Sequence, residues 1–107
     1  MNLHGIISVK LQFTRLLPKY LSDDEYRAFQ WYLIAYPDAG DVVRGSGGVR
    51  KIRWAEKGKG KRGGVRIIYY WKKSADEIWL LTTYSKKEKA TIKGHILKKI
   101  AEEIENE

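Results

Sequence analysis

The lysine and arginine side chains of this chain gather in one segment, residues 49–73, that glycine interrupts repeatedly. The segment holds ten bases and one acid, Glu56, whereas the rest of the chain holds eleven bases and twelve acids; the formal net charge of the whole is +8. Solubility alone usually mixes both signs of charge along a surface. A concentration of positive charge is suited to a polyanion such as nucleic acid, with a solvated basic loop as the alternative.

Several bases of this segment are placed where they could act on a phosphate. Arg66 follows the Gly63-Gly64 pair, where a loop re-enters a strand, so we expect it to be held more rigidly than the loop side chains. An ion pair with Glu56 is its alternative role. Glycines let a backbone approach a phosphate closely, and alternating bases add mobile charges around it. These loop bases are Lys57, Lys59, Lys61 and Arg62.

Further bases lie on or beside the predicted strands. Strand alternation gives each of them a set face, and cross-strand neighbours can gather several guanidinium groups. Tyr84 ends the last predicted strand just before a basic stretch. Two roles are open for its side chain: stacking or proton transfer at a functional site, or packing on the last helix. The bases of this group are Arg50, Lys51, Arg53, Lys72, Lys73, Lys86 and Lys87.

Other motifs point to no further chemistry. Residues 58–63 spell G-x-G-x-x-G, but a dinucleotide fingerprint must open a helix, whereas here a strand follows. A kinase is excluded because the chain has no H-R-D or D-F-G triplet. The absence of cysteine excludes disulfides, thiolate metal sites and thiol nucleophiles. His4 and His95 are isolated, and Ser85 with Glu88 could cap a helix.

Apolar spacing in the first half of the chain predicts a strand and then a helix. Alternation over residues 7–13 is typical of a half-buried strand. Ser22-Asp23-Asp24-Glu25 matches a capping box, and it begins a predicted helix over residues 22–35 that Pro37 ends. Glycine-rich turn residues fill positions 38–48.

The second half predicts three consecutive strands and a final helix, with a hairpin loop at 72–77. The strand segments are residues 49–54, 65–71 and 78–84, and the helical stripe is Ile92, Ile96, Ile100 and Ile104 with Leu97 and Ala101. The expected fold class is α+β: a small twisted, mostly antiparallel sheet of about four strands, with an N-terminal helix or helical hairpin and a C-terminal helix.

A chain of 107 residues is expected to form one domain, residues 1–107, with a modest core. Its first residues lack the basic and apolar regions of a signal peptide, and no apolar run approaches the ~20 residues that cross a bilayer. We therefore expect a cytoplasmic protein with no membrane partner. Thirteen aromatic residues are enough to fill this core and leave ring faces for bases or a partner.

Three stretches of the sequence carry a resemblance to a known family. They read R-K-I-R-W-A over residues 50–55, K-G-K-G-K-R-G-G-V-R-I-I-Y-Y over 57–70 and L-L-T-T-Y-S-K-K-E over 80–88, and residues 22–30 and 40–53 add to them. With the order strand, helix, glycine turn, three strands, helix, the chain resembles the RelE/HigB toxins of the RelE/ParE superfamily. It looks most like their HigB-type branch, and the resemblance covers almost the whole chain from Tyr20 onward.

The resemblance implies the toxin of a type II toxin–antitoxin system. Such a toxin is a small endoribonuclease that enters the ribosomal A site, cuts the mRNA codon there and so inhibits translation. The RNA's own 2′-OH attacks the adjacent phosphate, and no metal or cofactor is implied. A cognate antitoxin, expected to be a helix-turn-helix DNA-binding protein, holds the toxin inactive. We expect an acidic or helical antitoxin segment to cover the basic surface or block ribosome entry.

The resemblance also implies roles for single residues. Arg66 matches the strand arginine that contacts the scissile phosphate, and Tyr84 would orient or stack a base. A loop lysine crowded by other cations is the candidate general base. Lys93 and His95 occupy the place where many relatives carry a proton-transfer residue, which leaves the general acid unassigned. The predicted catalytic set is Arg66, Lys57, Lys59, Tyr84, Lys86 and Lys87, and the RNA- or ribosome-binding set is Arg50, Lys51, Arg53, Lys61, Arg62, Lys72 and Lys73.

Two other functions stay open at this point. A ParE-like gyrase inhibitor would share the fold without cutting RNA, although the basic loop favours the nuclease. A non-catalytic RNA-binding module would show salt-dependent affinity and aromatic rings stacked with bases, and nothing in residues 65–71 excludes it.

Overall fold

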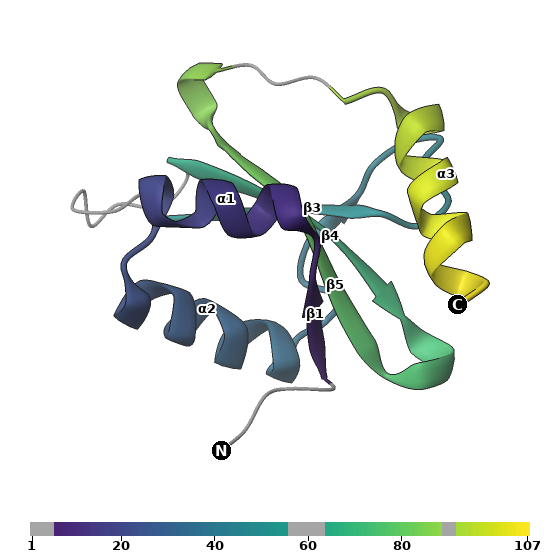
Figure 1. Ribbon diagram of the computed structural model, residues 1–107, viewed down its shortest axis with the longest axis horizontal. Helices are drawn as coiled ribbons and strands as arrows, with labels where there is room; N and C mark the ends of the chain where they lie inside the picture. Colours follow the sequence, from purple (N-terminus) through teal and green to yellow (C-terminus); the bar gives the residue numbers. More distant parts are fainter. Residues whose placement is uncertain (1–5, 56–63, 89–91) are drawn as a thin grey trace.

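The computed structural model describes residues 6–55, 64–88 and 92–107. A five-stranded sheet in the order β1-β5-β4-β3-β2 forms the centre, with β1 parallel to β5 and the other pairs antiparallel. Figure 1 shows the pair α1 and α2 on one side of the sheet and α3 on the other. The elements are β1 (Ile7–Val9), α1 (Leu11–Tyr20), α2 (Asp23–Ala35), β2 (Asp41–Val42), β3 (Arg50–Trp54), β4 (Val65–Lys72), β5 (Glu77–Ser85) and α3 (Gly94–Glu105), with short 3₁₀ turns η1 (Lys73–Ala75) and η2 (Lys86–Glu88).

The first strand is shorter than the alternation predicted. It ends at Val9, and helix α1 begins at Leu11, so the prediction of a strand through residue 13 is wrong. Phe13 and Tyr20, seven positions apart, are both buried on one face of this helix, whereas Leu11 is 64% exposed. A seven-residue window fits alternation and the start of a helix equally well, and only the longer pattern separates them.

Helix α2 begins and ends where the sequence predicts. The capping box is formed: Ser22 Oγ accepts from the Glu25 N–H at 3.2 Å, and Glu25 Oε1 accepts from the Ser22 N–H at 2.7 Å. Together α1 and α2 make a helical hairpin on one face of the sheet. The core between them contains Phe13, Phe29, Leu33, Ile52, Val65, Ile67, Tyr69 and Leu80.

Helix α3 covers part of the opposite face. Its buried side chains are Leu97, Ala101 and Ile104, which pack with Val49, Ile68, Tyr70 and Leu81. Of the predicted stripe, Leu97, Ala101 and Ile104 are buried, whereas Ile96 is 45% exposed. Residues spaced by four rotate about 40° per step around a helix, so a run of such spacings leaves the buried face.

The sheet has one strand more than the predicted number. Strand β2 pairs only with Arg50 and Lys51 at the start of β3. The turn between these strands uses glycine where the backbone requires it: Gly47 and Gly48 have φ of 73° and 106°. Buried Ser46 fixes the turn, with its Oγ donating to the Val43 carbonyl at 2.6 Å.

A bulge interrupts the pairing of β4 with β5. Ile68 lies opposite Thr82 and Tyr69 lies opposite Leu80, so Leu81 is an extra residue in β5. The alternation of β5 shifts by one position there. From Thr82 onward, each side chain therefore lies on the opposite face from the one that strict alternation from Leu80 would give it. Within the residues described, no helix is long and apolar enough to span a bilayer.

Candidate functional site

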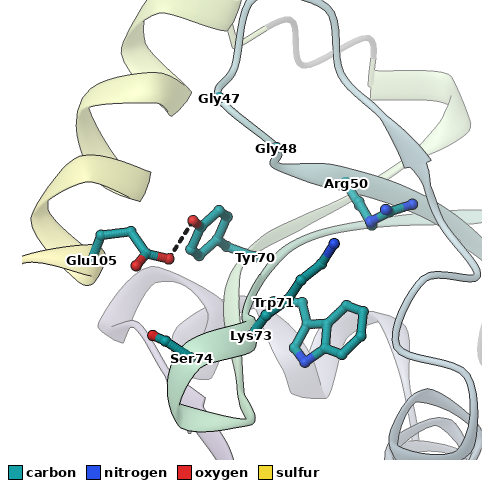
Figure 2. Close-up of a pocket in the computed structure, with 8 residues that line it drawn as sticks. All are labelled: Gly47, Gly48, Arg50, Tyr70, Trp71, Lys73, Ser74 and Glu105. Atoms are coloured by element: carbon teal, nitrogen blue, oxygen red, sulfur yellow. Dashed lines mark hydrogen bonds between the residues drawn. The ribbon is translucent and has the colours of Figure 1, made fainter.

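The predicted binding bases divide between two ends of the sheet. Arg50 and Lys73 lie near the start of β3 and the end of β4, where they line a pocket of about 350 Å³ with Trp71 (Figure 2). Arg66 lies at the other end of β4, six residues before Lys72, which is about 20 Å at the usual rise of a strand. The bases at the two ends therefore cannot contact the same phosphate.

Two bases at this far end are engaged within the protein. Arg50 Nη1 donates to the carbonyl oxygens of Asp38 at 3.1 Å and Gly40 at 2.7 Å, which ties down the chain between α2 and β2. Lys72 is buried, and its Nζ donates to the carbonyl of Glu107 at 3.2 Å. The sequence placed Lys72 on a binding surface; the structure differs because the chain end after α3 covers it.

At the other end, three predicted site residues stand side by side across the sheet. Arg53 of β3 lies opposite Arg66 of β4, and Arg66 lies opposite Tyr84 of β5. Directly opposed residues have their Cβ atoms about 4.5–5.5 Å apart and share a face. Arg53 is exposed, and the other two side chains are half-buried. This Arg–Arg–Tyr row can present two guanidinium groups and a phenol to one ligand.

The surroundings of Tyr84 favour its neutral form. Burial raises the pKa of its phenol above the ordinary value of 10, and the nearby positive charge of Arg66 opposes part of that rise. Tyr84 therefore keeps its proton at neutral pH. It can donate a hydrogen bond or a proton beside Arg66.

The predicted basic pair lies at the same end of the sheet. Lys86 and Lys87 are exposed on η2, directly after β5. The Lys86 N–H donates to the carbonyl of Gly64 at 3.0 Å, so η2 sits against the point where the glycine-rich segment enters β4. The predicted loop residues Lys57, Lys59, Lys61 and Arg62 lie outside the described residues.

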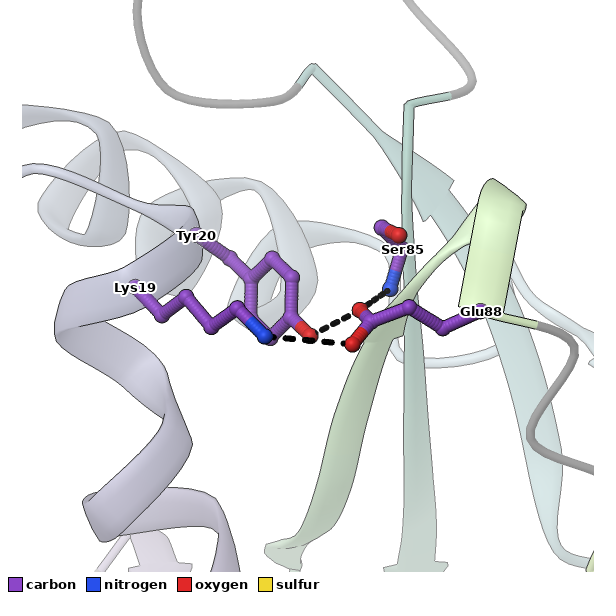
Figure 3. Close-up of polar contacts among 4 residues, drawn as sticks. All are labelled: Lys19, Tyr20, Ser85 and Glu88. Carbon is purple, nitrogen blue, oxygen red and sulfur yellow. Dashed lines mark hydrogen bonds and ion pairs between the residues drawn. The ribbon is translucent and has the colours of Figure 1, made fainter.

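Glu88 fixes η2 to helix α1 (Figure 3). Its Oε1 accepts from the Tyr20 hydroxyl and from the Ser85 N–H, the latter at 3.0 Å, and its Oε2 pairs with Lys19 Nζ at 3.1 Å. The hydrogen bond from Tyr20, followed by those from Ser85 and Lys19, lowers the pKa of Glu88 to about 2. The spacing of Ser85 and Glu88 was a visible signal of this contact, but nothing in the sequence pointed to Tyr20.

A groove runs along the edge of β3 beside the row. It has a volume of about 590 Å³, and we refer to it as the edge groove. Strand β2 pairs with β3 only at Arg50 and Lys51, so no strand in the described part of the chain pairs with this edge of β3 from Ile52 to Trp54. The residues that matter below are Tyr32, Asp41, Lys51, Arg53, Trp54 and Arg66. The sequence analysis did not single out Tyr32 or Trp54 as site residues. Tyr32 lies outside the basic segment, and helix α2 brings it to the groove.

Among the residues described, no three His, Asp or Glu side chains gather as a metal site would require. The chemistry of this end rests on guanidinium, ammonium and phenol groups. Such groups suit an anionic ligand whose charge grows during a reaction.

These elements define a RelE-like fold: a helical hairpin, a five-stranded and mostly antiparallel sheet, and a C-terminal helix. Among solved structures, the chain is similar to the isolated E. coli RelE toxin, with a TM-score of 0.55 over 94% of this chain and 98% of that chain. The two sequences are 11% identical, so the likeness is one of fold. A comparison with protein-family models found no match. The α+β fold predicted from the sequence is confirmed, with five strands in place of about four.

Proposed function

We propose that this protein is the toxin of a type II toxin–antitoxin system and a ribosome-dependent endoribonuclease that cuts mRNA in the A site. The observation that carries the proposal is the row of Arg53, Arg66 and Tyr84 beside the exposed bases of η2. The RelE-like fold supports the same reading. We place it in the HigB-type branch as part of this proposal, on the sequence motifs of residues 50–55, 57–70 and 80–88.

The proposed reaction is attack by a ribose 2′-oxygen on the adjacent phosphorus. The bond from the 2′-oxygen to phosphorus forms as the bond to the 5′-oxygen breaks, which gives a cyclic phosphate and a free 5′-hydroxyl. Arg66, with Arg53 beside it, neutralises the charge on the phosphate oxygens. Tyr84 carries a proton at neutral pH and gives it to the departing 5′-oxygen. A loop lysine of the glycine-rich segment, with its charged form disfavoured by the neighbouring cations, takes the proton of the 2′-OH.

Substitution of Arg66 tests this proposal. Removing one well-placed donor to a transition-state oxyanion lowers kcat by about 10²–10³-fold, so Arg66→Ala should cut mRNA at least a hundredfold more slowly. Arg66→Lys should recover part of the activity, since it keeps the charge but not the planar fork. The measurement is the mapping of mRNA 5′ ends in a translating extract.

The control for this test is Lys99→Ala, which removes an exposed base of helix α3 that belongs to neither predicted set. It should leave cutting unchanged, and thermal unfolding of each variant checks that it is folded. Transcripts that stay intact with the unsubstituted protein contradict the nuclease. DNA breaks that depend on gyrase would then support an inhibitor of the ParE type, and RNA binding without cuts would support a binding module.

The proposed partner is a cognate antitoxin that covers the cationic end of the sheet. Arg53, Lys86 and Lys87 are exposed there, and an acidic segment is the complement of such a surface. Co-expression with the product of a neighbouring reading frame, followed by co-purification and the cleavage assay, tests this partnership.

A further inference from the structure

The edge groove combines aromatic rings with basic side chains. Tyr32 and Trp54 line it together with Lys51, Arg53 and Arg66. Single-stranded nucleic acid is bound by this combination, in which cations follow the backbone and rings stack on the bases. Asp41 is the one acid among the described residues of the lining, against the three bases Lys51, Arg53 and Arg66.

The two rings are held in place by their neighbours. Tyr32 and Trp54 lie with their centroids 5.3 Å apart and their planes at 51°. Trp54 is fixed in turn by edge contact with Phe29 of the core, at 5.1 Å and 74°. Tyr32 remains 40% exposed. A ring that is both anchored and accessible offers a base a stacking surface at little entropic cost.

The stretch Ala39–Asp41, which also lines the groove, is fixed as well. The Tyr69 hydroxyl donates to the Pro37 carbonyl at 2.8 Å and accepts from the Gly40 N–H at 2.9 Å. The two hydrogen bonds from Arg50 to Asp38 and Gly40 hold the same stretch. Because its walls keep their shape, the groove is preformed, and its volume lies within the ~300–1,000 Å³ of ordinary ligand sites.

We propose that Tyr32, supported by Trp54, is a stacking platform for one base of single-stranded RNA whose phosphate lies on Arg53 and Arg66. This inference rests on the proposed nuclease function and adds to it a residue that selects which nucleotide lies beside the scissile phosphate. The open edge of β3 lets the strand pass from the row to the rings. An acidic peptide paired along that edge is the other occupant that the test must separate.

The test measures binding of a short 2′-O-methyl RNA, which has no nucleophile and cannot be cut, by fluorescence anisotropy at low salt. Loss of one stacked base corresponds to roughly a fivefold to hundredfold weaker binding, and we expect Tyr32→Ala to fall in that range. Tyr32→Phe keeps the ring and should bind like the unsubstituted protein. Trp31→Ala is the matched control, because Trp31 lies on the same helix and is 42% exposed but does not line the groove.

A second RNA with one abasic position keeps every phosphate and removes the stacking partner. It should bind the unsubstituted protein more weakly, and Tyr32→Ala should no longer distinguish it from the intact RNA. Equal binding of both RNAs by the unsubstituted protein overturns the platform. So does an equal loss in Trp31→Ala, or a Tyr32→Ala variant that loses affinity only for a Glu-rich peptide.

Cleavage on ribosomes separates this inference from the function on which it rests. If Tyr32→Ala cuts mRNA at the same positions and with the same KM as the unsubstituted protein, the platform is overturned and the nuclease stands. If the oligonucleotide results hold but ribosomal mRNA stays intact, the nuclease is overturned and the groove remains an RNA site. We expect Tyr32→Ala to raise KM and broaden the choice of positions while kcat changes little.

Discussion

Tyr84 and Glu88 lie four residues apart, and their surroundings fix opposite protonation states. Burial keeps the phenol of Tyr84 neutral beside Arg66, whereas hydrogen bonds from Tyr20, Ser85 and Lys19 keep the carboxylate of Glu88 charged. The first residue can donate a proton to a reacting phosphate, and the second can hold η2 in place. A tyrosine and a glutamate have these protonation states at neutral pH by residue type; the surroundings strengthen both and fix where each group lies.

Replacement of Glu88 tests its part in positioning η2. Glu88→Gln keeps the shape but loses the ion pair with Lys19, so we expect Lys86 and Lys87 to be held less firmly and cleavage to slow several-fold. The pKa of Glu88 is about 2, against 4.5 ordinarily, so its contribution to stability is complete above about pH 4.5 and is lost as pH falls toward 2.

Urea unfolding between about pH 2 and pH 6 measures this dependence. Part of the loss of stability at low pH should disappear in Glu88→Gln. The full loss should persist in Glu102→Gln, which removes an exposed acid of α3. An unaltered acid profile in Glu88→Gln, together with full cleavage, would show that η2 does not depend on this carboxylate.

At the scale of elements, the sequence predicted what local patterns determine. The capping box at Ser22 and Glu25 placed α2, and β-forming segments placed β3, β4 and β5. The start of α1 was missed because its face is completed only at Tyr20, far from the window that suggested a strand. The neighbours of Arg66 depend on the register of strand pairing, and no short stretch of the sequence indicates that register.

The same limit applies to the candidate site. The sequence singled out Arg66, Tyr84 and the pair on η2, and it could not show that Lys72 is covered while Arg53 faces the same side as Arg66. Long-range contacts decide these points. The edge groove needs a ring from α2 that is distant in sequence from the bases it joins.

The attachment of α3 to the sheet gives a prediction at alkaline pH. Tyr70 of β4 donates to Glu105 of α3 at 2.5 Å, and burial, followed by this contact, raises the pKa of Tyr70 to about 12. Between about pH 10 and pH 12 the unfolded chain loses this proton and the folded protein keeps it. Stability should therefore fall over that interval.

Tyr70→Phe has no phenol proton to lose at this position. The free energy of unfolding of this variant should therefore decline less steeply between about pH 10 and about pH 12. Tyr36→Phe is the control, because Tyr36 is 57% exposed. Chemical unfolding at about pH 8 and about pH 11 measures the difference. An identical decline in Tyr70→Phe and the unsubstituted protein would contradict the assignment.

At the scale of the whole molecule, a net charge of +8 makes any nucleic-acid affinity depend on salt. Each phosphate neutralised on a single strand contributes about −0.7 to the slope of log affinity against log salt concentration. Arg53→Ala should make the slope shallower by about that amount, whereas Lys99→Ala, on the exposed side of α3, should leave it unchanged. Titration of RNA at several salt concentrations gives both slopes, and equal slopes for the two variants would place the RNA elsewhere.

The extra residue Leu81 has a consequence for how this chain is compared with others. Counted by strict alternation, Leu80 and Tyr84 would share a face, yet Leu80 lies in the core beneath the helical hairpin and Tyr84 lies beside Arg66. An alignment without a gap in β5 would therefore match the phenol to an interior position in any homologue that lacks the bulge. Equivalent positions in this strand have to be assigned by superposition rather than by counting.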